Sequence, residues 1–343
     1  MDGLEEIRKR YPLAPSTFAS ICKIPPQPDR STVFHAALSA VELQPFAIRP
    51  AERAWLRHIN EHTPIPYPIR EPVAEPRHKA SLLVQMDLTG EQWLGKLTQA
   101  ARRELLADRR PIYRVLDQAL RCAIDVLGHR GDGRGVSVGL DVLRSVHARV
   151  WEGAGGVGSG NELLQVEGIG AARLRKLADA GVRTVRRLAS LECYHIERLM
   201  SRNPPYGQTL LRQLAGFPLL TLDAEGLGEQ RSKDGGGDGG GGSRRTMMVR
   251  VVMGFENKAT PVWKGRTPWV SCVMEALEGR EEGKGKLLWF WRGSVKRLAV
   301  EGGGGGGKEV VVGVTTGYQG CKLRVTLACE VLVGTMVQKD LEL

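Results

Sequence analysis

The sequence lacks the features that mark several common protein classes. None of its six cysteines belongs to a C-x-x-C pair, so the sequence gives no support for a zinc site. No window approaches the ~18 apolar residues that a membrane-spanning helix needs, and residues 1–10 contain no apolar signal-peptide core. Most cysteines lie inside apolar runs, where a free thiol behaves as a small hydrophobic side chain. This usage favours a reducing compartment, the cytosol or the nucleus.

Motifs of common enzymes are missing as well. The seven histidines show no H-E-x-x-H spacing, and no G-x-S-x-G elbow occurs. Residues 302–309, GGGGGGKE, match the glycine and lysine spacing of an ATPase phosphate-binding loop. However, Glu309 stands where a hydroxyl should bind Mg²⁺, and residues 310–314 read as a strand rather than a helix. We therefore expect a flexible hairpin loop there, and no metal site, cofactor or ATPase activity in this chain alone. Acid–base catalysis stays open, because 38 acidic residues always offer candidate pairs.

Glycine and positive charge are what the chain has in excess. Its 343 residues include 43 glycines, far above the usual ~7%, and many lie in two runs at 235–242 and 302–307. The net charge of +11 points to a polyanionic partner, of which nucleic acid is the commonest. An anionic membrane surface and a merely solvated basic surface are the alternatives. The length allows two or three domains.

The pattern along the chain predicts helices first and strands last. Residues 1–50 read as the remnant of a preceding domain or a linker, with short helices at 4–10 and at 31–41 (capped by Ser31). Residues 51–152 read as a helical bundle in which Pro111 occupies the first turn of one helix. An apolar stripe at helical spacing assigns Leu116, Leu120, Ile124 and Leu143 to its core.

The C-terminal part changes from helical to alternating periodicity. Residues 161–218 read as a run of short helices, and residues 219–245 as a glycine-rich linker. In residues 246–343, apolar and polar side chains alternate in runs separated by turn residues, which is typical of an antiparallel sandwich of immunoglobulin-like size. The predicted fold class is therefore α+β and multidomain: a helical bundle with a helix-hairpin-helix, followed by an all-β immunoglobulin-like sandwich.

The most informative motif lies at residues 161–180, NELLQVEGIGAARLRKLADA. A short helix, the turn Gly168–Ile169–Gly170 and a second helix form a helix-hairpin-helix pattern. Two glycines allow a tight turn, and Ile169 can anchor it in the core. The amides of Gly168, Gly170 and Ala171 would then face outward at a helix N-terminus, which stabilises an oxyanion such as a DNA phosphate.

Basic residues surround this turn. Between residues 171 and 202, eight basic side chains face three acidic ones, and Arg173, Arg175 and Lys176 lie on the second helix. Such a surface would bind the DNA backbone without reading sequence, and the binding would weaken with salt. The alternative stays open that the turn is a plain structural corner and the charges are a solvated face.

Several strings resemble one known family, the meiotic crossover helicases (the Mer-three or Hfm-one family) of helicase superfamily two. The strings are AERAWLRHINEHTPIPYPI at 51–69, HKASLLVQ at 78–85, RCAIDV at 121–126, LDVLRSVHARVWEG at 140–153, GVRTVRRLASLECYHIERLMSRNPPYG at 181–207 and FPLL at 217–220. In order and spacing they resemble that family's Sec-sixty-three-type domain. Residues 249–276 are similar to the start of its immunoglobulin-like domain.

The resemblance implies a function as well as a fold. In the family, RecA-like domains that require ATP and magnesium move 3′ to 5′ along single-stranded DNA during meiotic crossing over. The Sec-sixty-three-type domain adds a bundle with a ratchet helix, a helix-hairpin-helix and a sandwich. Carried onto this chain, the hairpin falls on Gly168, Ile169, Gly170 and Ala171. The helix at 135–151 would lie near the strand, with Arg144 and Arg149 as candidate phosphate contacts.

The chain departs from the family in having no motor motifs, so we expect no helicase activity from it alone. The expected partners are single-stranded or branched DNA, together with motor domains or recombination proteins, in the nucleus and without a membrane. Related domains in spliceosomal RNA helicases bind proteins, so a protein–protein scaffold is the alternative function. A self-contained enzyme is a third possibility.

Overall fold

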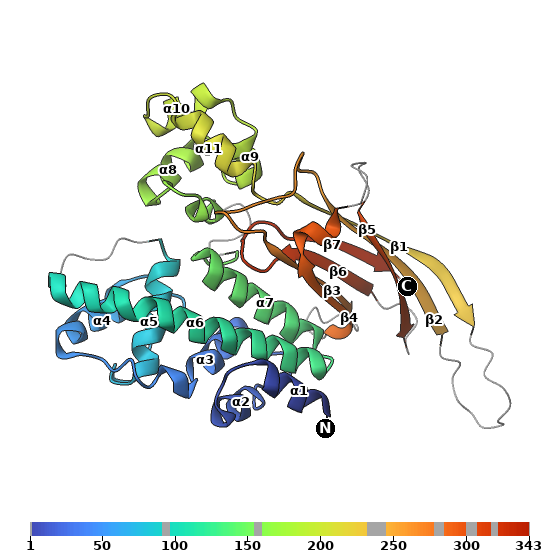
Figure 1. The fold of residues 1–343 in the computed structure, drawn as a ribbon, viewed down its shortest axis with the longest axis horizontal. Helices are drawn as coiled ribbons and strands as arrows, with labels where there is room; N and C mark the ends of the chain where they lie inside the picture. The colour runs from blue at the N-terminus through green and yellow to red at the C-terminus, as the bar shows by residue number, and fades with distance from the viewer. Residues whose placement is uncertain are drawn as a thin grey trace. The chain divides into compact units, whose positions relative to one another are not determined.

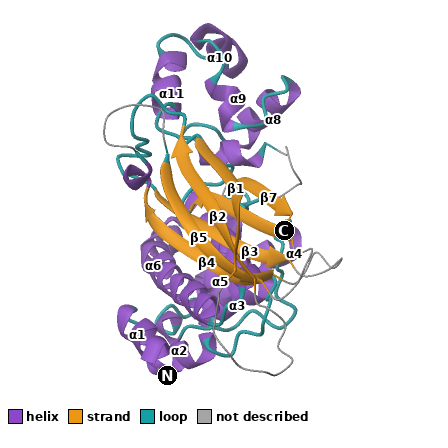
Figure 2. Ribbon diagram, turned by 90° about the vertical axis from the view of Figure 1, so that its right-hand side faces the viewer, coloured by secondary structure: helices purple, strands orange, loops and turns teal. Residues whose placement is uncertain are grey.

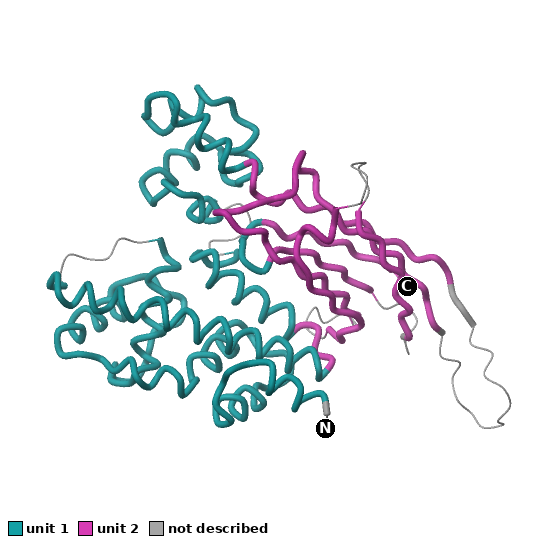
Figure 3. The backbone as a smooth tube through the Cα atoms, in the orientation of Figure 1, with its two compact units in different colours: residues 1–130, 135–214, 330–334 teal, residues 131–134, 215–329, 335–343 magenta. Residues whose placement is uncertain are grey.

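The structure, a computed structural model, describes residues 2–90, 97–153, 160–231, 245–277, 285–299, 307–316 and 322–342. It divides into two compact units, which are coloured separately in Figure 3. Unit 1 comprises Met1–Arg130, Gly135–Leu214 and Glu330–Gly334, and unit 2 comprises Gly131–Arg134, Ala215–Cys329 and Thr335–Leu343. In the described segments, no helix has the length and apolar content to cross a bilayer.

The N-terminal helices are an integral part of unit 1. They are α1 (Asp2–Arg10), α2 (Pro15–Ile21), α3 (Arg30–Leu38) and the short 3-10 helix η1 (Val41–Leu43). Phe34 of α3 is fully buried, and α1, α2 and α3 all pack against α6. The expectation that residues 1–50 are a linker or a remnant was therefore wrong, because their apolar side chains complete the core of this unit. The cap of α3 is Asp29, which accepts a 2.7 Å hydrogen bond from the Thr32 amide, and not Ser31.

The centre of unit 1 is formed by α4 (Pro50–His62), α5 (Pro76–Leu88), α6 (Gln99–His129) and α7 (Gly133–Ala148) (Figure 1). The predicted core residues Leu116, Leu120, Ile124 and Leu143 are all fully buried. Pro111, however, lies inside α6 rather than in its first turn. The helix continues through the proline because Leu105 and Ile112, on either side of it, are buried by tertiary packing that offsets the lost backbone hydrogen bond.

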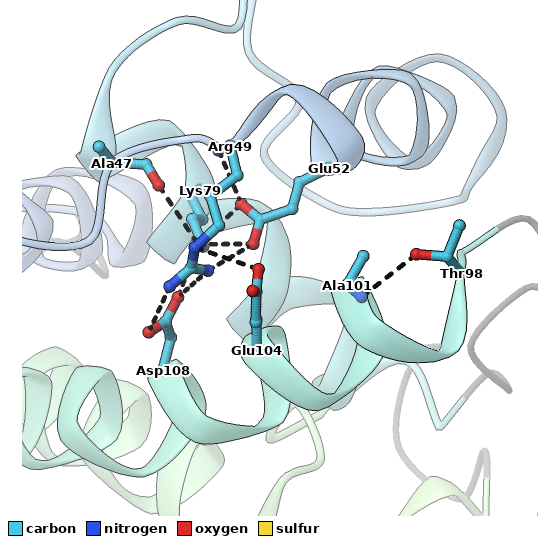
Figure 4. A network of polar contacts seen from close by, with 8 residues as sticks. All are labelled: Ala47, Arg49, Glu52, Lys79, Thr98, Ala101, Glu104 and Asp108. Carbon is cyan, nitrogen blue, oxygen red and sulfur yellow. Dashed lines mark hydrogen bonds and ion pairs between the residues drawn. The ribbon is translucent and has the colours of Figure 1, made fainter.

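Helix α5 is buried on all sides and carries an ionic network, which Figure 4 shows from close by. The ammonium Nζ of Lys79, 0% exposed, lies 2.7 Å from Glu52 Oε2 and 2.7 Å from Asp108 Oδ2. Arg49 Nη1 lies 2.7 Å from each of the same two carboxylates. Burial alone would raise the pKa of Asp108, but the hydrogen bonds from Arg49 and Lys79 outweigh it and lower that pKa. The network therefore joins α4, α5 and α6.

Short helices follow in the region of the predicted hairpin. They are η2 (Asn161–Gln165), α8 (Ala171–Asp179), α9 (Val185–Ala189), α10 (Cys193–Met200) and α11 (Tyr206–Leu214). The first element of the pattern is a 3-10 helix rather than an α-helix. Their buried residues lie at helical spacing on the inward faces, which leaves the charged faces in water.

Unit 2 contains two antiparallel sheets (Figure 2). In one sheet the order is β1-β2-β5, from β1 (Leu220–Arg231), β2 (Arg245–Phe255) and β5 (Lys308–Thr316). In the other it is β4-β3-β6-β7, from β3 (Trp269–Leu277), β4 (Gly285–Ser294), β6 (Lys322–Cys329) and β7 (Val337–Glu342). The expected linker at 219–245 was wrong in its first half, because β1 pairs with β2 from Leu220↔Phe255 to Arg231↔Arg245. Residues 235–242, the first glycine run, lie outside the described residues.

The predicted alternation forms the core of unit 2. Leu323, Val325 and Leu327 of β6 are fully buried, whereas Lys322, on the opposite face of the strand, is exposed. The sequence pattern gave no strand at β7, whose residues are mostly exposed and charged. Its pairing with β6, where Asp340 binds Arg324 at 3.0 Å, explains why so polar a segment is a strand.

Candidate nucleic-acid interface

The glycine-bracketed turn has the local geometry that its sequence predicts. Gly168 has a φ of +83°, which L-amino acids with a side chain rarely adopt. Ile169 is only 5% exposed, and its amide donates a 3.1 Å hydrogen bond to the Val166 carbonyl. Gly170 is the N-cap of α8, with extended backbone angles of −107° and −179°. The buried Ile169 therefore fixes the turn, and both flanking glycines remain at the surface.

The turn leaves backbone donors facing water. The Gly170 carbonyl accepts from the amides of Arg173 (3.0 Å) and Leu174 (2.9 Å), which starts the helix. Within the described part of the chain, the amides of Gly168, Gly170 and Ala171 donate no hydrogen bond, and no side chain caps α8. All three residues are exposed. Free amides at a helix N-terminus, where the dipole is positive, suit an oxyanion.

The three basic residues of α8 differ in how they are held. Arg173 is half-buried: its Nη1 donates to the Gly168 carbonyl, and its guanidinium lies 5.9 Å from the centroid of the Tyr206 ring. Arg173 thus stabilises the turn through the Gly168 carbonyl. Arg175 and Lys176 are exposed, and Lys176 Nζ donates a 3.1 Å hydrogen bond to Ser201 Oγ. On α8, Arg175 and Lys176 are therefore the cations that are accessible to a polyanion.

Exposed cations extend beyond α8. Apart from Arg173, the basic side chains counted in the sequence between residues 171 and 202 are all exposed, namely Arg175, Lys176, Arg183, Arg186, Arg187, Arg198 and Arg202. Of the three acids, Glu197 is half-buried and its Oε1 accepts a 2.9 Å hydrogen bond from the Gly207 amide. The surface charge beside the turn is therefore positive.

Arg144 and Arg149, the two positions expected near a strand, have different environments. Arg144 is 2% exposed, and its Nη1 lies 2.8 Å from Asp141 Oδ1 and 3.1 Å from Glu152 Oε2. Burial lowers the pKa of Arg144, but these carboxylates more than compensate, so the net shift is upward. The expectation that Arg144 contacts phosphate is corrected, because the side chain is enclosed and neutralised. Arg149 is exposed, follows the end of α7 at Ala148, and stacks 5.2 Å from the centroid of Tyr113.

Sequence reasoning missed a hollow beside the turn. Its volume is about 450 Å³, and it is lined by Ser201, Arg202, Asn203, Pro205, Tyr206 and Thr209. The SRNPPYG string at 201–207, the most family-specific piece of the sequence, supplies five of these six residues. The string also has a structural role, since a side chain on Gly207 would overlap the backbone of Cys193 in α10. The sequence signal that could have pointed to this hollow was the unusual combination of prolines and glycine at 201–207.

A half-buried acid, Glu162, lies just before the glycine turn. Glu162 of η2 accepts a 2.6 Å hydrogen bond from the Val185 amide through its Oε1. Burial raises the pKa of Glu162 to about 7, although the hydrogen bond from Val185 acts in the opposite direction. The carboxyl of Glu162 therefore titrates near neutral pH.

One cluster in the helical part has metal-ligand chemistry. Glu71, Glu75 and His78 bring two carboxylates and an imidazole within 4.8 Å of one another. His78 Nδ1, however, accepts hydrogen bonds of 3.3 Å from the amides of Ala74 and Glu75, so Nε2 carries the proton that binds Glu71 Oε1 at 2.8 Å. Arg77 also pairs with both carboxylates. Both ring nitrogens are thus already used, and the cluster acts as the N-terminal cap of α5.

The glycine–lysine string has its lysine on a strand. Lys308 begins β5, and its Nζ lies 5.7 Å from the centroid of Trp291. The sequence expectation of a strand after the glycine run is confirmed, whereas residues 302–306 lie outside the described part of the chain.

Comparison with protein families shows that residues 6–263 match the Sec63 Brl domain. The matched segment is more than half of the chain. The chain belongs to the Sec63 Brl domain family. No curated protein matches the sequence significantly.

The extent of the match agrees with the fold. The Sec63 Brl match starts at residue 6, within α1, so the matched domain includes α2, α3 and the second half of α1. It also includes the hairpin region and continues through β1 and β2. Domains of this family are found in the C-terminal regions of helicases, and the chain fits a helicase-associated domain.

Proposed function

We propose that this Sec63 Brl chain is the DNA-binding, helicase-associated region of a meiotic 3′ to 5′ DNA helicase. It holds the DNA backbone without sequence preference, and ATP hydrolysis comes from motor domains outside this chain. In this proposal, residues 161–179 act as a helix-hairpin-helix and unit 2 as an immunoglobulin-like sandwich. The partners are single-stranded or branched DNA, motor domains and recombination proteins in the nucleus.

One observation carries the proposal: the exposed amides of Gly168, Gly170 and Ala171 have no acceptor in the described chain. Free amides at the positive end of a helix can hold an anion such as phosphate. The exposed cations Arg175 and Lys176 of the same helix add charge that phosphate neutralises. Backbone contacts of this kind fix the position of a strand and read no bases.

The resemblance in the sequence supports the meiotic assignment. The strings HKASLLVQ at 78–85 and SRNPPYG at 201–207 are similar to the meiotic crossover helicases. In the structure the first string forms buried α5, and the second forms the loop between α10 and α11 together with the first turn of α11. Both strings therefore contribute to the fold of unit 1.

Fluorescence anisotropy of a labelled single strand, titrated with the full chain over a range of salt concentrations, tests the proposal. Each phosphate neutralised on a single strand contributes a slope of about −0.7 in a plot of log affinity against log salt. The double variant Arg175→Ala, Lys176→Ala should reduce that slope by about 1.4. The matched control, Arg53→Ala with Arg57→Ala, removes two exposed arginines of α4 and should leave the slope unchanged.

The outcomes separate the alternatives. Folded wild-type protein that binds no strand at low salt contradicts the proposal. An equal loss of slope in both double variants would mean that only net charge matters, and not the turn. A partner protein captured after nuclease treatment, together with absence of strand binding, would instead support the protein–protein scaffold.

A further inference from the structure

The hollow beside the turn is a built feature of unit 1. It is the 201–209 pocket, defined by Ser201, Arg202, Asn203, Pro205, Tyr206 and Thr209, with a volume of about 450 Å³. It spans the loop between α10 and α11 and the first turn of α11. Such a volume exceeds what one phosphate occupies and falls within the range of small-ligand sites.

Hydrogen bonds and close packing hold the pocket walls. Ser201 ends α10 in a left-handed conformation, with a φ of +51°. At the start of α11, the Gly207 amide donates to Glu197 of α10, and the Gly207 Cα approaches the Cys193 backbone too closely for a side chain. Two of the lining hydroxyls are engaged, since Ser201 Oγ accepts from Lys176 and Thr209 Oγ1 donates to the Pro205 carbonyl at 3.0 Å. The pocket is therefore preorganised, which lowers the entropic cost of binding.

Two exposed polar side chains of the pocket have no partner among the described residues. Among the described residues, the guanidinium of Arg202 and the carboxamide of Asn203 make no hydrogen bond or ion pair, and both residues are exposed. A carboxamide offers a donor and an acceptor side by side, and a guanidinium offers several donors in one plane. Beside them, Pro205 and the Tyr206 ring provide flat apolar surface. Planar donors and acceptors next to an apolar wall suit a nucleobase rather than a bare anion.

The pocket and the glycine turn lie next to each other. A Cβ placed on Gly168 would lie 3.6 Å from the Tyr206 hydroxyl and 3.4 Å from Arg173 Nη1. Lys176 of α8 donates to Ser201 in the pocket wall. A strand whose phosphate lies at the turn therefore has its neighbouring nucleotide within reach of the pocket.

From this geometry we infer that the 201–209 pocket receives one unpaired base of the strand whose phosphate is held at residues 168–171. The inference rests on the proposed backbone contact and names its substrate class, single-stranded nucleic acid. A base in a duplex is paired and stacked, so it cannot enter the pocket without the cost of being flipped out. The interface therefore favours single strands over duplex, although its phosphate contacts alone would accept both.

The test uses the full chain and three short DNA probes of one length: a single strand, the same strand with abasic sites, and its duplex. Asn203→Ala and Arg202→Ala should each weaken binding of the intact single strand by roughly tenfold, the usual worth of a base-edge contact. Neither variant should weaken binding of the abasic strand by more than about twofold. The wild-type chain should bind the duplex more weakly than the single strand. Arg212→Ala is the matched control, because Arg212 is an exposed cation of α11 that does not line the pocket.

Each outcome distinguishes the pocket from the turn. Equal affinity of wild-type protein for the intact and the abasic strand overturns the inference about the base and leaves the backbone proposal standing. A loss in Asn203→Ala that is the same on both strands also overturns it, because the pocket would then hold sugar or phosphate. Failure of all probes to bind contradicts the proposed function itself.

Discussion

Replacing Gly170 by aspartate should weaken DNA binding strongly while stabilising the protein. Gly170 is the N-cap of α8, its backbone is extended, and a Cβ added there meets no atom within 4 Å. The new carboxylate of Gly170→Asp can therefore accept from the free amides at the start of the helix, as N-cap aspartates do. It would occupy the position proposed for a phosphate oxygen.

The magnitudes follow from this geometry. A better cap contributes a few tenths of a kcal/mol, and an acid at the positive helix end adds about 0.3–1 kcal/mol, so unfolding should cost about 0.5–1 kcal/mol more. For binding, loss of a charge-assisted hydrogen bond costs about 1.5–3 kcal/mol. Repulsion between two anions a few ångströms apart in water adds about 1 kcal/mol. The dissociation constant for single-stranded DNA should therefore rise roughly a hundredfold or more.

Gly170→Ala is the matched control for this experiment. It adds the same Cβ without a charge, and every backbone amide of the turn is kept. We expect its affinity to stay within about threefold of wild type and its stability to fall by about 0.5 kcal/mol, because alanine is a poor N-cap. Anisotropy gives the affinities, and urea unfolding gives the stabilities. Tight binding by folded Gly170→Asp would refute the reasoning, since the amides would then hold nothing.

Two further predictions concern the fold. Lys79→Met should lower the free energy of unfolding by about 3 kcal/mol, because it removes the fully buried cation that Glu52 and Asp108 share and leaves them only Arg49, which is partly exposed. Lys9→Met on the exposed face of α1 should change the free energy of unfolding by less than about 0.5 kcal/mol. Equal urea midpoints for the two variants would contradict the role of the network. Glu162→Gln should stabilise the protein at pH 8 and have almost no effect at pH 4.5. The pKa of Glu162 is raised to about 7 in the folded state, so its ionisation opposes folding as pH rises from about 4.5 to 7. The expected gain at pH 8 is about 1–2 kcal/mol after allowing for partial exposure to water, and a gain of the same size at both pH values would exclude this explanation.

The sequence predicted best where a local pattern alone determines the structure. The apolar stripe of α6 and the alternation in β2 and β6 required only periodicity, and the structure has both. The turn at Gly168 also followed from local chemistry, because a positive φ favours glycine. For these elements a stretch of about ten residues contained the whole signal.

The failures have tertiary causes. Pro111 marks a helix start in isolation, yet packing around Leu105 and Ile112 extends α6 through it. The polar strand β7 depends on its pairing with the preceding strand, β6. The sequence suggested that Arg144 is a surface cation, whereas in the structure it is paired with Asp141 and Glu152. In each case the packing or pairing that decides the outcome cannot be recognised from the pattern of residue types alone.

The sequence predicted one part of the candidate site, the glycine turn, but not the pocket beside it. Gly168, Ile169, Gly170 and Ala171 stood out as a motif, whereas the 201–209 pocket depends on the turn between α10 and α11. The SRNPPYG string showed that these residues are unusual but not that they surround a hollow. Only the structure brings Tyr206 next to Gly168.

Hydrogen exchange at the turn, measured by mass spectrometry with and without a short single strand, tests the central claim most directly. Without DNA, the amides of Gly168, Gly170 and Ala171 should exchange at nearly the rate of an unstructured peptide, because in the described chain they have no acceptor. Saturating DNA should slow their exchange, and the slowing should be absent in Gly170→Asp. Binding that leaves these amides exchanging as fast as before would contradict the account.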